Sequence, residues 1–251
     1  MKIHPVKGRL VNSYVIEDGN DLLIIDVAWR GEKYVLGFIR EVLKRSLHDV
    51  KLITYTHSDP DHNGGVANVA ATCNAQIAAP YASQSARLKL AHDPTGYLFK
   101  LTTALLEGLR PRAWLMYANP RKDAHARTLP SHIPELNTSK KTESSRKKAA
   151  FEQPLRLRNN DVLPGFTNWQ VIHTPGHSWD SNCYYHKPSE TLISGDTLLG
   201  SNKKGGLVKP AVFSNPLQLR RTIKKLKQLN PKAVYPGHGP HFHGSNLLEH
   251  L

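Results

Sequence analysis

Residues 56–65 read Thr-His-Ser-Asp-Pro-Asp-His-Asn-Gly-Gly, so two histidines and two aspartates fall within six residues, closed by a pair of glycines. Directly before them, residues 51–56 form an apolar and β-branched run that predicts a buried strand. A strand that ends in such a loop aims several side chains at one point beyond its C-terminal end, where α/β sheets keep their ligand sites. Imidazole and carboxylate suit divalent Zn, Mn and Fe, and four candidate ligands are more than one ion needs from one loop. The stretch raises the hypothesis of a two-metal hydrolytic centre.

The chain of 251 residues is 39% hydrophobic, which is typical of a globular protein with one large domain or two small ones. It has no apolar run near the roughly 20 residues that cross a bilayer, and residues 1–7 lack the apolar core of a signal peptide. Its two cysteines are too few for a disulfide framework. We therefore expect a cytoplasmic protein without a membrane partner.

The charge balance is strongly basic, because 34 lysines and arginines outnumber 20 aspartates and glutamates and give a formal net charge of +14. Such a surface attracts polyanions, including nucleic acid and phosphorylated substrates. A basic run at residues 139–148 has no interleaved aromatic residues on which bases could stack, and is more typical of a solvated loop. Nucleic acid therefore remains an alternative to a small-molecule substrate.

Strands and helices alternate along both halves of the chain, which predicts the α/β class. The predicted helices lie at residues 32–46, 66–71, 83–90, 97–109 and 216–229, and the predicted strands at 10–16, 21–27, 51–56, 76–79, 169–173, 182–186, 191–194 and 232–235. In the last helix the apolar positions are Leu217, Leu219, Ile223, Leu226 and Leu229. This order predicts two packed β-sheets with helices outside, in a single domain 1–251 with a helical and basic insertion around 81–154.

Three further motifs in the second half each follow an apolar strand and each contain a glycine. They are His-Thr-Pro-Gly-His-Ser at 173–178, Ser-Gly-Asp-Thr at 194–197, and Tyr-Pro-Gly-His-Gly-Pro at 235–240. Glycine lets the backbone turn sharply and come close to a ligand. Core packing does not explain why a strand, a glycine turn and a histidine or aspartate should recur four times, so these motifs predict one shared site.

At these motifs the chain resembles the metallo-β-lactamase-fold superfamily. The pattern is His-x-(His/Asp/Glu)-x-Asp-His, then Gly-His, then Gly-Asp, then Gly-His, and all four occur here in that order. The resemblance covers nearly the whole chain. It implies a four-layer αβ/βα sandwich of two mixed β-sheets with outer helices.

The resemblance also implies two adjacent metal sites that share a bridging ligand. The first would be held by His57, Asp59 and His177, the second by Asp61, His62 and His238, and the bridge would be Asp196. A hydroxide between two divalent ions would be the nucleophile, oriented by Asp61 as the catalytic residue. Zinc is the metal we expect, with manganese or iron as alternatives.

Asp59 departs from the commonest pattern, which has histidine at this position. A carboxylate is an accepted alternative ligand and shifts the preference of the first site away from zinc toward manganese or iron. The other reading places Asp59 just outside the ligand shell, which would leave the first site weak or empty. The sequence leaves both readings open.

The form His-Thr-Pro-Gly-His at 173–177 resembles the glyoxalase II and lactonase-like branches of the superfamily. We therefore predict hydrolysis of an ester, thioester or lactone of a small molecule. A metal-dependent nuclease or phosphodiesterase is the alternative that the basic charge favours, and a non-hydrolytic iron-dependent dioxygenase is the alternative that Asp59 favours. The substrate and the oligomeric state stay open.

Overall fold

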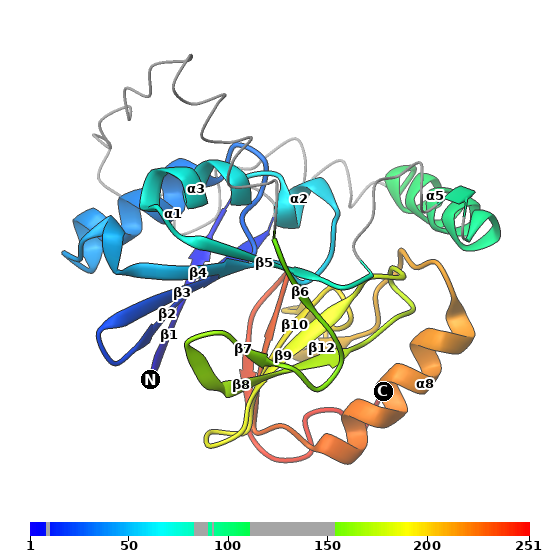
Figure 1. Ribbon diagram of the computed structural model, residues 1–251. Helices are drawn as coiled ribbons and strands as arrows, with labels where there is room; N and C mark the ends of the chain where they lie inside the picture. The colour runs from blue at the N-terminus through cyan, green and yellow to red at the C-terminus, as the bar shows by residue number, and fades with distance from the viewer. Residues whose placement is uncertain (9–10, 83–89, 92, 111–153) are drawn as a thin grey trace.

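The computed structural model describes residues 1–8, 11–82, 90–91, 93–110 and 154–251 (Figure 1). The first five strands and β6, which follows residue 154, build one six-stranded sheet, in which β1 to β3 are antiparallel neighbours and β3 to β6 are parallel. Its strands, in spatial order, are β1 (Lys2–Lys7), β2 (Asn12–Asp18), β3 (Asp21–Ile25), β4 (Val50–Thr54), β5 (Gln76–Pro80) and β6 (Leu155–Leu157). The sheet is therefore mixed, as predicted.

The second half builds another six-stranded sheet, which is antiparallel except for the pair β10 and β13. In spatial order it contains β14 (Phe242–His243), β13 (Ala233–Pro236), β10 (Thr191–Gly195), β9 (Asn182–His186), β8 (Phe166–His173) and β7 (Val162–Leu163). A separate two-stranded ribbon joins β11 (Leu199–Ser201) to β12 (Gly206–Val208).

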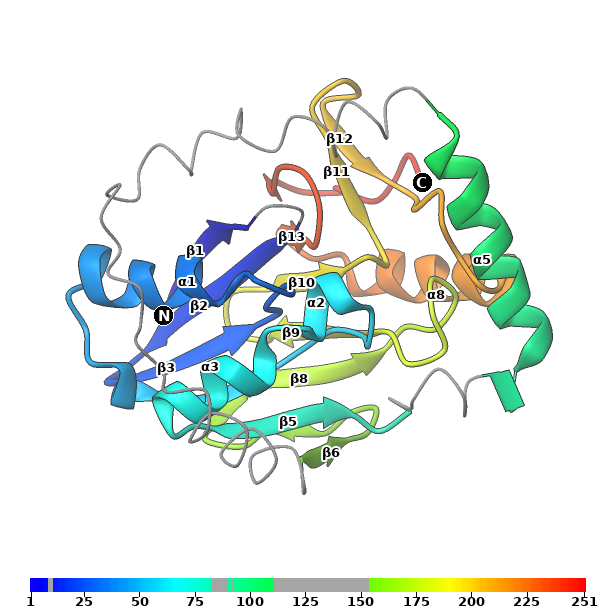
Figure 2. The same ribbon diagram turned by 90° about the horizontal axis from the view of Figure 1, so that it is seen from above.

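Helices cover the outer faces of the two sheets, which gives the four predicted layers (Figures 1 and 2). Over the first sheet lie α1 (Glu32–Gly37), which continues as a π-helix (Phe38–Val42), and α3 (Val66–Cys73). Below the second sheet lies α8 (Pro216–Leu229), which buries Leu219, Ile223 and Leu226 against it. The other helices whose bounds fall in the described ranges are a 3-10 turn (Leu47–Asp49), α2 (Pro60–Asn63) and α5 (Pro94–Gly108).

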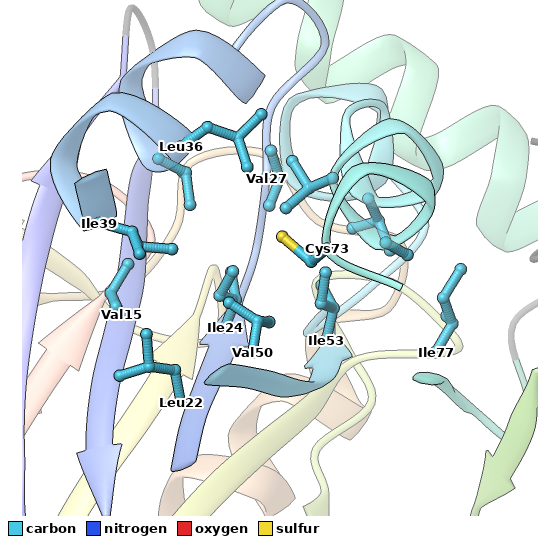
Figure 3. Close-up of a cluster of buried hydrophobic side chains, with 14 of the residues drawn as sticks. Val15, Leu22, Ile24, Val27, Leu36, Ile39, Val50, Ile53, Cys73 and Ile77 are labelled. Atoms are coloured by element: carbon cyan, nitrogen blue, oxygen red, sulfur yellow. The ribbon is translucent and has the colours of Figure 1, made fainter. Parts of the chain in front are cut away.

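Apolar side chains fill both sides of the first sheet. Because successive side chains of a strand point to opposite faces, Leu23 and Ile25 face the second sheet while Leu22 and Ile24 face the helices (Figure 3). All four are fully buried, and each such side chain contributes about 1.5–3 kcal/mol relative to an exposed one. The continuous apolar sequence of β3 is thus explained by burial on two faces.

Two details of the sequence prediction are wrong. The helix expected over 32–46 ends at Val42, because the chain turns into a left-handed conformation at Lys44, with φ of 54°. Leu217, which was expected among the apolar positions of α8, is 68% exposed in the first turn of that helix.

The helix predicted at 83–90 lies outside the described residues except for Leu90, and the basic run at 139–148 lies entirely outside them. Most of the predicted insertion therefore stays a prediction. Within the described ranges, none of the helices has the length and apolar character needed to cross a membrane.

The loops that carry the four motifs meet at one edge of the sandwich. The amide of Asn182 donates to the carbonyl of Thr56, which joins the end of β4 in one sheet to the start of β9 in the other. The amide of Gly237 donates to the carbonyl of Gly195, which joins the loops after β13 and β10. One backbone hydrogen bond between the sheets and one within the second sheet therefore fix the loops relative to one another.

Candidate metal centre

The loop after β4 changes from extended to helical backbone within a few residues. Asp59 is extended, with φ of −73° and ψ of 143°, and Pro60 begins α2 directly after it. Proline suits the first position of a helix, because its φ is already helical and the missing N–H has no intrahelical partner there. This change of direction lets residues 57 to 62 supply ligands to two neighbouring points.

The first point is surrounded by His57, Asp59 and His177. Oδ2 of Asp59 lies 3.3 Å from Nε2 of His57 and 3.5 Å from Nε2 of His177. The ligand atoms of this group lie within 4.8 Å of one another. The structure therefore places Asp59 among the candidate ligands, which favours the first of the two readings.

The second point is surrounded by Asp61, His62 and His238. Oδ2 of Asp61 lies 3.4 Å from Nε2 of His238 and 3.8 Å from Nε2 of His62. Asp196 lies between the two points, with Oδ1 at 3.4 Å from His62 Nε2 and Oδ2 at 3.8 Å from His177 Nε2. The fold thus brings together all seven residues that the motifs predicted, and Asp196 stands where a shared ligand would.

Several polar atoms of this cluster are buried without a hydrogen-bond partner among the described residues. They are Nε2 of His57, His62 and His177 and Oδ1 of Asp196. Buried polar atoms nearly always have a partner, and an unsatisfied one costs about 1–3 kcal/mol. Three inward-facing imidazole nitrogens and a carboxylate oxygen are a donor set that a divalent metal of the zinc type would satisfy, so the residues fit the implied metals.

The opposite nitrogen of each ring is held in place. Nδ1 of His62 donates to the carboxylate of Asp26 at 2.8 Å, and Nδ1 of His177 donates to the carbonyl of Val212 at 2.8 Å. Nδ1 of His57 lies 3.1 Å from the hydroxyl of Thr56, which itself donates to Asp26. These bonds assign the proton to Nδ1 and leave the lone pair of Nε2 directed into the cluster.

Two glycines are required by the close approach of the backbone to the centre. A Cβ on Gly237 would lie 2.5 Å from Oδ1 of Asp196 and 2.6 Å from Cε1 of His62. Gly195 has φ of 49°, and a Cβ there would collide with the side chain of Thr56. The glycines of the Gly-Asp and Gly-His motifs therefore make room for the ligands beside them.

The carboxylates of the cluster stay ionised despite their burial. Burial opposes the charge of Asp196, yet His238 and His62 hold its pKa well below the usual range. Burial likewise opposes the charge of Asp59, but His57 and Lys100 lower its pKa well below the usual range. Anionic oxygens at neutral pH are what a cation site requires.

Sequence reasoning missed two residues that contact the predicted ligands. Asp26, directly after β3, is fully buried and accepts the hydrogen bond from His62. Lys100, in the middle of α5, donates from Nζ to Oδ2 of Asp59 at 2.6 Å. Each lies more than thirty residues from its partner and outside every motif.

The family model described as "Metallo-beta-lactamase superfamily" matches residues 6–238. This chain belongs to that superfamily, and the predicted membership is confirmed.

Curated relatives and solved structures agree with this assignment. The chain is 25% identical over 228 residues to "Beta-lactamase-like protein 2 homolog" of Drosophila melanogaster, covering 91% of this chain and 58% of that protein. It is 43% identical over 72 residues to a hydroxyacylglutathione hydrolase of Hydrogenovibrio crunogenus, covering 28% of this chain and 24% of the relative. A crystal structure of TTHA1623 in a di-iron-bound form has a TM-score of 0.56 at 22% identity, covering 97% of this chain and 94% of that one. The relatives include a hydrolase, and the chain spans little more than half of the Drosophila protein.

Proposed function

We propose that this protein is a binuclear metal-dependent hydrolase that cleaves an ester, thioester or lactone bond of a small molecule. The observation that carries the proposal is the convergence of three unpaired, buried Nε2 atoms and three carboxylates on two adjacent points. A site with two such points matches two-metal hydrolytic centres, in which both the attacking and the leaving oxygen are stabilised.

The chain's own residues divide between the two ions. His57, Asp59 and His177 would hold one, Asp61, His62 and His238 the other, and Asp196 would contact both. When bound, the ions would lower the pKa of water toward neutrality and polarise the carbonyl oxygen under attack. We propose zinc as the metal, with manganese or iron as alternatives because the carboxylate of Asp59 makes the first site harder.

Asp61 is proposed to orient the attacking water and to take its proton. Its side chain is 31% exposed, whereas that of Asp196 is 12% exposed, so Asp61 is the more accessible of the two carboxylates to a water from solvent. Burial opposes its charge, but His238 and His62 lower its pKa, so it is an acceptor at neutral pH. A general base must be ionised at the working pH.

A thioester is the substrate class that we favour. The match to a hydroxyacylglutathione hydrolase supports it, because a hydroxyacylglutathione is a thioester. The net charge of +14 supports a substrate that carries negative charge. A small anionic thioester is therefore the first substrate to test.

The experiment is hydrolysis of S-lactoylglutathione and of a neutral thioester by zinc-loaded protein and its variants. We expect Asp61→Asn to lower kcat by about 10²–10⁴-fold, the range of general base catalysis, when it is assayed at a zinc concentration shown by elemental analysis to fill both groups. Glu190→Gln, which changes a surface carboxylate away from the centre, should be as active as the wild type. Equal turnover by Asp61→Asn and the wild type would contradict the proposal.

The same protein preparation also tests the two alternative functions. Salt-sensitive cleavage of single-stranded DNA or RNA in place of thioester hydrolysis would support the nuclease alternative. Two results together would support the dioxygenase alternative: iron bound to protein purified without added metal, and consumption of oxygen when a persulfide is supplied as substrate. We also propose that residues 1–251 form one domain and that the protein is cytoplasmic.

A further inference from the structure

Lys100 brings a fixed positive charge to one of the two metal groups. Its Nζ donates to Oδ2 of Asp59 at 2.6 Å, and its side chain is only 16% exposed. This same oxygen lies 3.3 Å from Nε2 of His57 and 3.5 Å from Nε2 of His177. The ammonium group therefore shares the carboxylate oxygen that faces the first metal group.

The second metal group lies beside an additional negative charge, whereas the first lies beside the positive charge of Lys100. Behind His62 lies the buried carboxylate of Asp26, which strengthens Nε2 as a metal ligand. Among the described residues, Nδ1 of His177 meets a backbone carbonyl, and Nδ1 of His57 meets the hydroxyl of Thr56, which itself donates to Asp26. One group is thus supported by direct contact with an anion, and the other is contacted by neutral groups and a cation.

A divalent ion and an ammonium group compete when they contact the same oxygen, and like charges repel strongly at such distances away from bulk water. We propose that Lys100 weakens metal binding to His57, Asp59 and His177, so that the two sites fill in order, the group of Asp61, His62 and His238 first. The inference rests on the proposed two-metal centre but not on its hydrolytic activity.

The remaining contacts of α5 supply a control. The hydroxyl of Thr103 bonds to the backbone of Phe213 at 3.2 Å, and the ring of Phe99 lies 5.6 Å from that of Phe213. Thr103→Val loosens the attachment of α5 while leaving the charge of Lys100 in place. An effect of charge can therefore be separated from an effect of helix docking.

The test is zinc affinity measured by competition with a chromophoric chelator. His238→Ala disables the second group, so binding in that background reports the first group. Adding Lys100→Met should tighten zinc binding by about tenfold or more, the scale on which groups outside the ligand shell act. Adding Lys100→Arg or Thr103→Val should leave the affinity near that of His238→Ala alone.

Unchanged or weaker binding with Lys100→Met would overturn the inference, and so would an equal gain with Thr103→Val. Circular dichroism checks that each variant is folded, and Lys100→Gln replaces Lys100→Met if the latter is not. If the protein binds zinc in this pattern but hydrolyses no thioester, the inference stands and the proposed function fails.

Discussion

The carboxylate of Asp26 accepts a hydrogen bond from Nδ1 of His62 at 2.8 Å, and both side chains are completely buried. The other carboxylate oxygen accepts from the backbone amide of Thr56 at 2.7 Å. One buried aspartate therefore holds both the start of the metal loop and the ring of a ligand near its end. This arrangement sets the tautomer of His62 and increases its strength as a ligand.

We predict that Asp26→Asn lowers the zinc affinity of the second group by about 10–100-fold, because His62 loses its anionic partner. Stability should fall by about 1–3 kcal/mol, the usual effect of leaving buried polar groups poorly paired. Chelator competition and urea denaturation measure the two effects. Glu190→Gln, whose carboxylate pairs with Lys232 on the surface, is the control for zinc affinity and should not change it. Wild-type affinity in Asp26→Asn would show that His62 needs no anionic support.

Gly237→Ala should impair metal binding while the fold survives. The added methyl group would lie about 2.5 Å from Asp196 and His62, so one of these side chains must move. We expect zinc stoichiometry or affinity to fall, as measured by dialysis and elemental analysis. The matched control is Gly108→Ala at the end of α5, where a Cβ meets nothing within 4 Å. Equal zinc binding by both variants would contradict the close approach at Gly237.

The metal-free protein should lose stability as the pH rises above neutrality. Burial by itself lowers the pKa of His238, but Asp196 and Asp61 outweigh burial and raise the pKa to about 10. In the unfolded chain the pKa is about 6.5. Because the folded value is the higher one, the contribution of His238 to stability is complete below about pH 6.5 and disappears as the pH rises through about 10.

Urea denaturation of chelator-treated protein between pH 7 and pH 10 measures this loss. In His238→Gln the corresponding part of the decline should be absent, because glutamine does not titrate. Parallel stability profiles of the wild type and the variant would mean that the carboxylates around His238 do not hold its proton.

The ligand set could be predicted from the sequence because each motif is local. His57, His177, Asp196 and His238 each follow a strand that the apolar pattern marks, and a glycine lies within a few residues of most of them. Chain direction alone then places these residues at one edge of the sheets. The layers could be predicted for the same reason, because the spacing of apolar residues along a strand or helix indicates whether one or two of its faces are buried.

The groups around the ligands could not be predicted in this way. Asp26 is a single carboxylate after an apolar strand, and nothing in its neighbourhood points to a histidine 36 residues away. Lys100 lies in a helix in which most of the neighbouring residues are apolar. Its partner Asp59 lies 41 residues away in the sequence. Such contacts depend on tertiary packing, which neither periodicity nor spacing encodes.

We propose that this protein holds two metal ions, and zinc stoichiometry tests that proposal most directly. Equilibrium dialysis at saturating zinc, followed by elemental analysis, should give two ions per chain in the wild type. It should give one in His57→Ala and one in His238→Ala, because each variant removes a ligand from a different group. A single ion in the wild type, or unchanged stoichiometry in both variants, would contradict the account.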